Sequence, residues 1–267
     1  MTTRISDSWA SGAAYEAYIG RWSRVVAPEF LAWLRIPPGQ RWLDVGSGTG
    51  ALTGAILADC DPRSVVGIDP SEGFVEHARA AVVDARARFR VATAAETALP
   101  DAAVDVVVAG LVLNHVPDAA AALAEAVRVV SPSGMVAGYV WDYAEGMQLV
   151  RRFWEAAVVL DPKAAALEQG GRFPIAARDP FAAAFTAAGL EAVDVRSIDI
   201  PTVFADFDDF WTPFLGGTGP APAYLASLAE SARGSLRERL RASLPAEPDG
   251  SIRLTARAWA AKGRRPA

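Results

Sequence analysis

Two carboxylates and three glycines in the first third of the chain have the spacing of a ligand site. Asp44 stands two residues before the run Gly46-Ser47-Gly48-Thr49-Gly50. Glycine accepts positive φ and lets the backbone approach a ligand closely. Asp69, followed by Pro70, comes about 20 residues after the glycines, where an acidic side chain binds ribose hydroxyls in nucleotide-binding folds. These residues predict a site for a nucleoside-containing ligand.

The carboxylate of Asp44 separates two kinds of ligand. The glycine spacing alone also fits the dinucleotide pattern G-x-G-x-x-G/A, with Ala51 in the last place. A carboxylate beside the turn repels a pyrophosphate, because the charges are alike. It suits a ligand with an ammonium group at that end. S-adenosylmethionine (SAM) has an ammonium, a sulfonium and a ribose, and no phosphate.

Alternating strands and helices must position these residues. An apolar strand at 41–45 leads into the glycines, and another at 64–69 ends at Asp69. The near-continuous apolar run 104–109 is typical of a central parallel strand buried on both faces. Further strands are expected at 88–93, 135–142, 190–199 and 252–260, and helices at 11–34, 72–84, 118–130, 179–189 and 224–244. This alternation predicts an α/β fold with a parallel sheet.

The segment Leu43-Asp44-Val45-Gly46-Ser47-Gly48-Thr49-Gly50 resembles the first motif of class I SAM-dependent methyltransferases. The alternative is a generic strand–turn–helix of an unrelated fold. The resemblance implies a Rossmann-like, seven-stranded, mostly parallel sheet with an antiparallel last strand and helical lid insertions. It implies one domain over 1–267, with a SAM-binding core at 41–142 and lid segments at 1–36, 143–178 and 200–248.

The resemblance also implies which residues bind the cofactor. SAM, and its product S-adenosylhomocysteine (SAH), would contact Asp44, Gly46, Ser47, Gly48, Gly50, Asp69 and Pro70. The segment 93–101 corresponds to the part that contacts adenine in relatives. Many relatives carry an acidic residue early in it, where this chain has Ala94, so backbone amides near Ala95 and Glu96 are expected to bind adenine instead.

An aromatic-rich helix often lies over bound SAM in this family. Tyr18 and Arg21 are therefore expected to help close the pocket, with Arg21 pairing with the SAM carboxylate. The alternative is an amphipathic helix that covers one edge of the sheet.

The segment after 104–109 lies beside the transferable methyl group in methyltransferases. Leu111 is expected at the cofactor and Asn114 at the substrate. His115 is the first candidate for a general base, because a histidine near its ordinary pKa can accept a proton from an acceptor. A structural role for His115 is the alternative. Asp142 is the second candidate base, and Trp141 beside it is expected to face the substrate.

The densest aromatic cluster lies between residues 201 and 222. Phe207 and Trp211 in it are candidates for an apolar wall against a substrate, and core packing is the alternative. Asp206, Asp208 and Asp209 have no His or Cys beside them, and short acidic steps commonly cap helices. No metal site is expected.

Composition narrows the functional classes. The formal net charge is −5 without a basic block, which argues against nucleic-acid binding. Cys60 is the only cysteine, so no disulfide forms within the chain. The longest apolar run, 106–113, is too short to span a bilayer. A cytoplasmic enzyme acting on a small molecule is expected, and the sequence does not indicate an oligomeric state.

Several functions remain open at this level. The leading hypothesis is methyl transfer from SAM to a small organic acceptor at O, N or C. A SAM-binding enzyme that catalyses a non-methylating reaction is possible on the same fold. An NAD-dependent oxidoreductase fits the glycine spacing but not Asp44. A non-catalytic module with a decayed site has only Ala94 in its favour.

Overall fold

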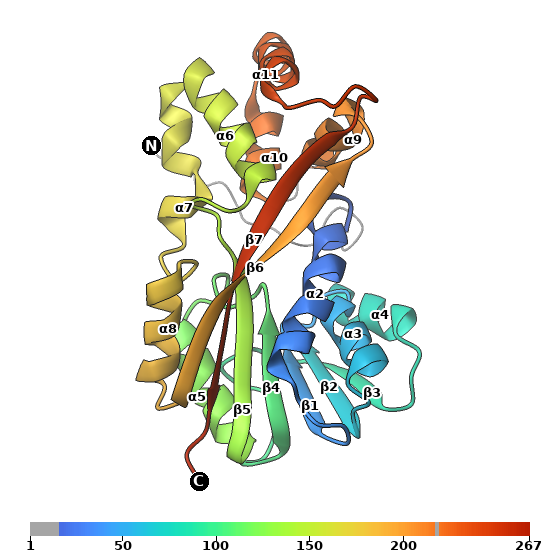
Figure 1. Cartoon of the computed structure of the whole chain (residues 1–267), viewed down its shortest axis with the longest axis vertical. Coiled ribbons are helices and arrows are strands. Elements are labelled where there is room, and N and C mark those ends of the chain that lie inside the picture. Colours follow the sequence, from blue (N-terminus) through green and yellow to red (C-terminus); the bar gives the residue numbers. More distant parts are fainter. Residues whose placement is uncertain (1–15, 217–218) are drawn as a thin grey trace. The chain divides into compact units, whose positions relative to one another are not determined.

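A seven-stranded sheet with the order β3-β2-β1-β4-β5-β7-β6 organises the computed structural model, which describes residues 16–216 and 219–267 (Figure 1). Strands β1 to β5 are parallel to their neighbours, and β7 runs antiparallel to β5. This arrangement confirms the predicted mostly parallel sheet with an antiparallel last strand. The strands are β1 Arg41–Val45, β2 Ser64–Asp69, β3 Ala87–Val91, β4 Val104–Gly110, β5 Val130–Trp141, β6 Glu191–Phe204 and β7 Ile252–Arg264.

Helices connect the strands. They are η1 Glu16–Gly20, α2 Arg21–Leu34, α3 Ala51–Asp59, α4 Glu72–Ala81, α5 Ala119–Val129, α6 Gln148–Leu160, η2 Pro162–Leu167, α7 Gln169–Arg172, α8 Arg178–Ala187, α9 Phe207–Trp211, η3 Thr212–Gly216, α10 Pro220–Ser227 and α11 Glu230–Ser243. Across the ranges that the structure describes, no helix combines the length and the apolar composition needed to cross a membrane.

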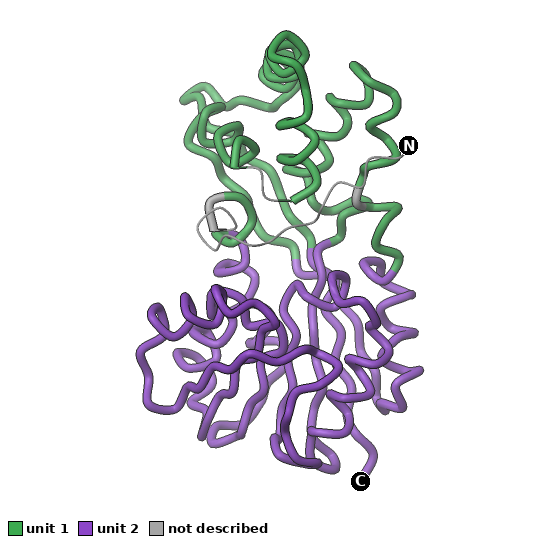
Figure 2. The backbone as a smooth tube through the Cα atoms, turned by 180° about the vertical axis from the view of Figure 1, so that it is seen from behind, with its two compact units in different colours: residues 1–21, 142–174, 199–257 green, residues 22–141, 175–198, 258–267 purple. Residues whose placement is uncertain are grey.

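The chain divides into two compact units (Figure 2). Unit 1 contains the described residues up to 21, together with 142–174 and 199–257. Unit 2 contains residues 22–141, 175–198 and 258–267, and therefore holds β1 to β5. Unit 1 consists largely of the segments that were expected as lid insertions. Their function as a lid stays a prediction.

The register of unit 2 brings three strand ends to one level. Val45 at the end of β1 lies opposite Ile68 of β2 and Ala109 of β4. Parallel strands that are aligned in this way present their carboxyl ends at the same edge, where α/β proteins bind ligands. Helix α4 packs on β2 and β3, and α5 packs on β5 with α8 against it. The apolar run of β4 is buried on both faces, as its sequence predicts.

Aromatic side chains fill the interior of unit 1. The Phe153 ring stacks on Phe214 with centroids 4.7 Å apart, and the Trp154 and Tyr224 rings are 5.5 Å apart. All four side chains are buried. Burial of such large apolar surfaces is the main source of stability for a unit with few strands.

Several boundaries differ from those expected. The first helix was expected from residue 11, but residues before 16 lie outside the described part and 16–20 form a π-helical turn. Residues 131–134 belong to β5, where Ser133 has φ 60° beside a register shift. The helix expected over 224–244 is divided between α10 and α11, because Leu228 is extended and its carbonyl accepts a hydrogen bond from Arg233.

Candidate cofactor and active site

The glycine turn between β1 and α3 has the left-handed backbone that its sequence predicts. The φ angles of Gly46, Gly48 and Gly50 are 68°, 52° and 87°. A Cβ atom added at Gly46 would lie 2.4 Å from Val112 Cγ2, so the loop after β4 packs directly against the turn. The turn is therefore specified by conformation and by space.

Asp44 is a buried carboxylate beside this turn, with only 1% of its surface exposed. Thr53 Oγ1 donates a hydrogen bond to its Oδ2 at 2.6 Å. The other oxygen, Oδ1, has no hydrogen-bond partner among the described residues. Burial raises the pKa of Asp44 to about 7, while the Thr53 hydrogen bond acts to lower it. A buried, half-satisfied carboxylate is a costly arrangement that a cationic ligand group would relieve.

Asp69 ends β2 next to the glycine turn, and two backbone amides fix its carboxylate. Gly48 donates to Oδ2 at 3.1 Å and Ser71 donates to Oδ1 at 2.9 Å. Each carboxylate oxygen can accept a further hydrogen bond. Burial raises the pKa of Asp69, and the two amides act to lower it. The exposed Pro70 follows directly.

The loop after β4 carries the residues expected nearest the chemistry. Leu111 has φ 60°, a strained value for a non-glycine residue, and its amide donates to the Tyr139 carbonyl at 2.7 Å. Neither polar atom of the buried Asn114 amide has a hydrogen-bond partner within the described part of the chain. The half-buried His115 closes the loop through its backbone amide, 2.8 Å from the Val112 carbonyl oxygen.

The segment after β3 begins beside Asp69. The Ala92 amide donates to the Asp69 carbonyl at 3.2 Å, and the Glu96 amide donates to the Thr93 carbonyl at 3.2 Å. The resulting tight turn exposes Ala95 and Glu96. The segment expected to contact adenine is thus adjacent to the carboxylate expected to bind ribose.

Trp141 and Asp142 follow each other in sequence but belong to different units. Trp141 is 1% exposed, and its indole N–H finds no hydrogen-bond acceptor in the described residues. Asp142 Oδ1 accepts from the Glu145 amide at 3.0 Å, and its Oδ2 lies 3.8 Å from Arg257 Nη1. These contacts give Asp142 a structural task in unit 1 at the turn that leads to α6.

Tyr18 and Arg21 lie in unit 1 among aromatic side chains. The buried Tyr18 ring is 5.3 Å from the Phe214 ring, edge to face. Arg21 forms an ion pair of 2.7 Å with Asp209, and its guanidinium lies 4.7 Å from the Phe204 ring centroid. Their role at a cofactor stays a prediction.

Phe207 and Trp211 are buried side chains on α9. Their rings stack at 6.2 Å with an interplanar angle of 12°, and the Arg241 guanidinium lies 4.2 Å from the Phe207 ring. Packing within unit 1 thus accounts for the contacts of both, and a contact with substrate stays a prediction.

The three aspartates around α9 have structural contacts. Asp206 caps the helix by accepting from the Asp209 amide at 2.8 Å, and Asp208 pairs with Arg237 at 2.8 Å. No cluster of three or more His, Cys, Asp and Glu side chains suited to a metal ion occurs among the residues described.

Two site residues were not expected from the sequence. Thr53 holds Asp44 from the first turn of α3, three residues after Gly50. Val112 covers Gly46 from the loop after β4. A hydroxyl in the turn that follows the glycines was a possible signal for Thr53. No sequence pattern marks Val112, because its contact depends on the register between β1 and β4.

Comparison with known proteins agrees with this geometry. The family model described as a methyltransferase domain matches residues 43–138. The 2-methyl-6-phytyl-1,4-hydroquinone methyltransferase of a Synechocystis species is 33% identical over 66% of this chain and 55% of its own length. The 27-O-demethylrifamycin SV methyltransferase of Amycolatopsis mediterranei is 35% identical over 55% of this chain and 58% of its own length. The chain therefore spans little more than half the length of these curated relatives.

Solved structures carry the same fold. Phosphoethanolamine N-methyltransferase 2 of Haemonchus contortus, crystallised with SAM, aligns over 100% of this chain and 59% of its own length with a TM-score of 0.59. The sequence identity is 17%, so this likeness concerns the fold alone. Residues 43–138 therefore match a methyltransferase domain, and the sheet with its antiparallel β7 has the fold of solved methyltransferases.

Proposed function

We propose that this chain transfers the methyl group of SAM to a small organic acceptor at O, N or C. The observation that carries the proposal is the buried Asp44 carboxylate, whose Oδ1 has no hydrogen-bond partner in the described chain. It lies beside a left-handed glycine turn and next to Asp69. An ammonium group satisfies this oxygen, whereas a phosphate would be repelled by it.

The residues present fit the cofactor in three places along one edge of the sheet. Asp44 at the end of β1 would bind the ammonium, and Asp69 at the end of β2 would accept ribose hydroxyls. The turn at Ala95 and Glu96 after β3 would bind adenine through backbone amides, first of all that of Ala95, because the Glu96 amide already donates to the Thr93 carbonyl. The strand order β3-β2-β1 supports this order of contacts, because neighbouring strand ends are adjacent in space.

The bound cofactor supplies a methyl group that is already activated by its sulfonium. The protein then has to orient the acceptor in line with that group and exclude water. The loop from Leu111 to His115 is suited to this task, because Val112 anchors it against the glycine turn. The Asn114 amide, buried and without a partner in the residues described, would orient a polar group of the acceptor.

His115 is the base that we propose for acceptors that must lose a proton. Asp142 is the weaker candidate, because the Glu145 amide and the Arg257 guanidinium already contact its oxygens. His115→Ala should then lower kcat by about 100-fold with a protonated acceptor. A rate that does not change removes His115 as the base.

The acceptor that we infer is a mostly apolar or aromatic small molecule. By their names, two relatives act on a hydroquinone and on a rifamycin. Trp141, Phe207 and Trp211 are the aromatic side chains proposed to select it. A screen of phenols, hydroquinones and amines, with mass detection of a gain of one methyl group, tests this inference.

Calorimetric titration with SAM and then SAH tests the proposed cofactor. Both should bind at micromolar Kd, and Asp69→Ala should weaken both by at least about tenfold, because two ribose hydrogen bonds to a charged group are lost. Asp105→Ala is the matched control, since Asp105 pairs with Arg41 at 2.7 Å at the opposite end of the strands. Binding of NADH in place of SAM would contradict the proposal, and a product without an added methyl group would indicate a non-methylating reaction.

A further inference from the structure

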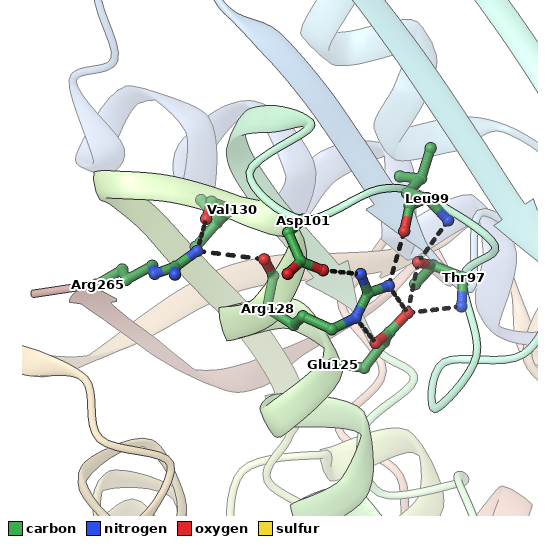
Figure 3. A network of polar contacts seen from close by, with 7 residues as sticks. All are labelled: Thr97, Leu99, Asp101, Glu125, Arg128, Val130 and Arg265. Carbon is green, nitrogen blue, oxygen red and sulfur yellow. Dashed lines mark hydrogen bonds and ion pairs between the residues drawn. The ribbon is translucent and has the colours of Figure 1, made fainter.

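A polar network fastens the segment after β3 to helix α5 (Figure 3). Glu125 Oε1 accepts hydrogen bonds from the amide and the hydroxyl of Thr97, at 2.9 and 2.7 Å. Arg128 donates to the Leu99 carbonyl at 2.7 Å and pairs with Glu125 at 2.7 Å. The same guanidinium pairs with the exposed Asp101. Helix α5 thus contacts Thr97, Leu99 and Asp101 of this segment.

The helix end that carries this network is itself held by Arg265. Its Nη1 donates to the Val130 carbonyl at 2.6 Å and to the Arg128 carbonyl at 3.2 Å. Figure 3 shows Arg265 on the far side of Arg128 from Thr97. The position of Arg128 is therefore fixed from both directions.

The segment needs such support, because little apolar surface anchors it. Residues Ala95, Glu96 and Ala98 are exposed, and Thr97 is the buried residue among them. Ala98 has φ 54°, a left-handed value that is unfavourable for a residue with a side chain. The two contacts that flank Ala98, at Thr97 and Leu99, hold the chain in that conformation. Strain of this kind persists only where the surroundings impose it.

The supported turn lies beside the proposed ribose site. At its start, the Ala92 amide bonds to the carbonyl of Asp69 itself. At its end, Thr97 is bonded to Glu125. The residues between these two anchors, Thr93 to Glu96, form the tight turn, in which Ala95 and Glu96 are exposed and the Glu96 amide donates to the Thr93 carbonyl.

We propose that Glu125 and Arg128 are positioning residues that set the turn at Ala95 and Glu96 for recognition of the adenine base. The inference rests on the proposed function and deepens it. This chain has Ala94 where an acidic side chain would otherwise read the adenine amine, so recognition depends on where the backbone amides lie. A network that fixes the backbone then replaces a side chain that touches the base.

The preference of the protein for adenine over another nucleobase distinguishes a positioning role of Glu125 and Arg128 from a purely structural role. Calorimetry would compare SAH with its analogue in which hypoxanthine replaces adenine. Glu125→Gln should weaken SAH binding by about tenfold and the analogue by less, because the amides no longer match the adenine edge. The Kd of the analogue divided by the Kd of SAH should therefore fall. Glu155→Gln is the control, since Glu155 pairs with Arg151 on α6 and takes no part in the network, and it should leave both Kd values within about twofold.

Arg128→Lys provides a second route if Glu125→Gln does not fold. It keeps the charge but loses the planar fork that reaches Leu99 and Glu125 together. The same fall in the Kd ratio is expected. Equal weakening of both ligands, or no change in either, would overturn the inference while leaving the proposed function intact. Failure of the unmodified protein to bind SAH would overturn the proposed function, and the inference with it.

Discussion

The two units differ in what their buried polar atoms contact. In unit 2, at the ends of β1 and β4, Asp44 Oδ1, Ser47 Oγ and the Asn114 amide lack hydrogen-bond partners within the described chain. In unit 1, Arg21 pairs with Asp209 and Arg237 with Asp208. Unit 1 also has buried atoms without a hydrogen-bond partner in the described chain, namely the hydroxyls of Tyr18, Thr202 and Ser251 and Nε of Arg233, although Arg233 donates to the Leu228 carbonyl through Nη2.

This difference in hydrogen-bond partners indicates which part of the fold is suited to bind a ligand. An unsatisfied buried polar atom is costly and is removed by selection unless something satisfies it. In unit 2, Asp44 and Ser47 flank the first glycine of the turn and Asn114 lies in the loop that packs on that turn, whereas in unit 1 the charged side chains of Arg21 and Arg237 pair with aspartates around α9. We therefore expect ligand binding in unit 2 and mainly packing contacts in unit 1.

Replacing the central carboxylate should produce the largest effect. Asp44→Asn keeps the shape and removes the charge, so SAM affinity should fall by about 100-fold, the scale of losing one partner of a buried charge pair. Thermal stability without ligand should not decrease, because burial of that charge was unfavourable. Isothermal calorimetry and a melting curve measure the two quantities. Retention of affinity would mean that Asp44 does not face the ammonium.

A matched pair of glycine substitutions sharpens the comparison between the units. A Cβ atom at Gly46 would lie 2.4 Å from Val112, and one at Gly146 in unit 1 would lie 2.3 Å from Arg257 Cβ. Both Gly46→Ala and Gly146→Ala should destabilise the protein by about 2 kcal/mol, because each forces a shift in a packed region. Only Gly46→Ala should also weaken SAM binding. An equal loss of SAM affinity in both variants would end the distinction between site and scaffold.

Cofactor affinity should depend on pH through Asp44. Its folded pKa of about 7 lies above its ordinary 3.8, so the ligand-free protein loses stability as the pH rises from 3.8 to about 7. An ammonium ligand needs the ionised form. SAM affinity should therefore fall by about tenfold for each pH unit below about 7. Calorimetry from pH 5 to 8 measures this, and the slope should disappear in Asp44→Asn.

The smallest effect is expected at the ion pair of unit 1. Arg21 and Asp209 are each about a third exposed, so Arg21→Met should cost less than about 1 kcal/mol in chemical denaturation. SAM affinity should stay within about twofold if Arg21 remains with Asp209. A larger loss in Arg21→Met, together with tighter binding in Asp209→Asn, would show that Arg21 leaves its ion pair to meet the cofactor carboxylate.

Much of the fold could be predicted because its signals are local. The strand, the glycines and Asp44 are contiguous, and the apolar run of β4 is typical of a buried parallel strand. Ser71 stands directly before Glu72 and is a residue type that commonly caps helices, and its hydroxyl accepts a hydrogen bond from the Phe74 amide at 3.4 Å. Such features depend on neighbours in the sequence, so one stretch of residues is enough to identify them.

The remaining features depend on contacts between distant residues. Val112 covers a glycine 66 positions earlier, and Glu125 bonds Thr97 across 28 positions. The ion pair of Arg21 joins residues 188 positions apart. Only the three-dimensional arrangement brings these residues together.

The position of β7 has a consequence for the order in which a growing chain can fold. In the sheet, β7 separates β5 from β6, although it is made after both. During synthesis, β6 has emerged while the edge of β5 is still open, and an open edge readily pairs with the wrong strand. The native sheet closes only when the last strand inserts. The emergence of β7 from the ribosome therefore sets the moment at which the open edge of β5 is covered.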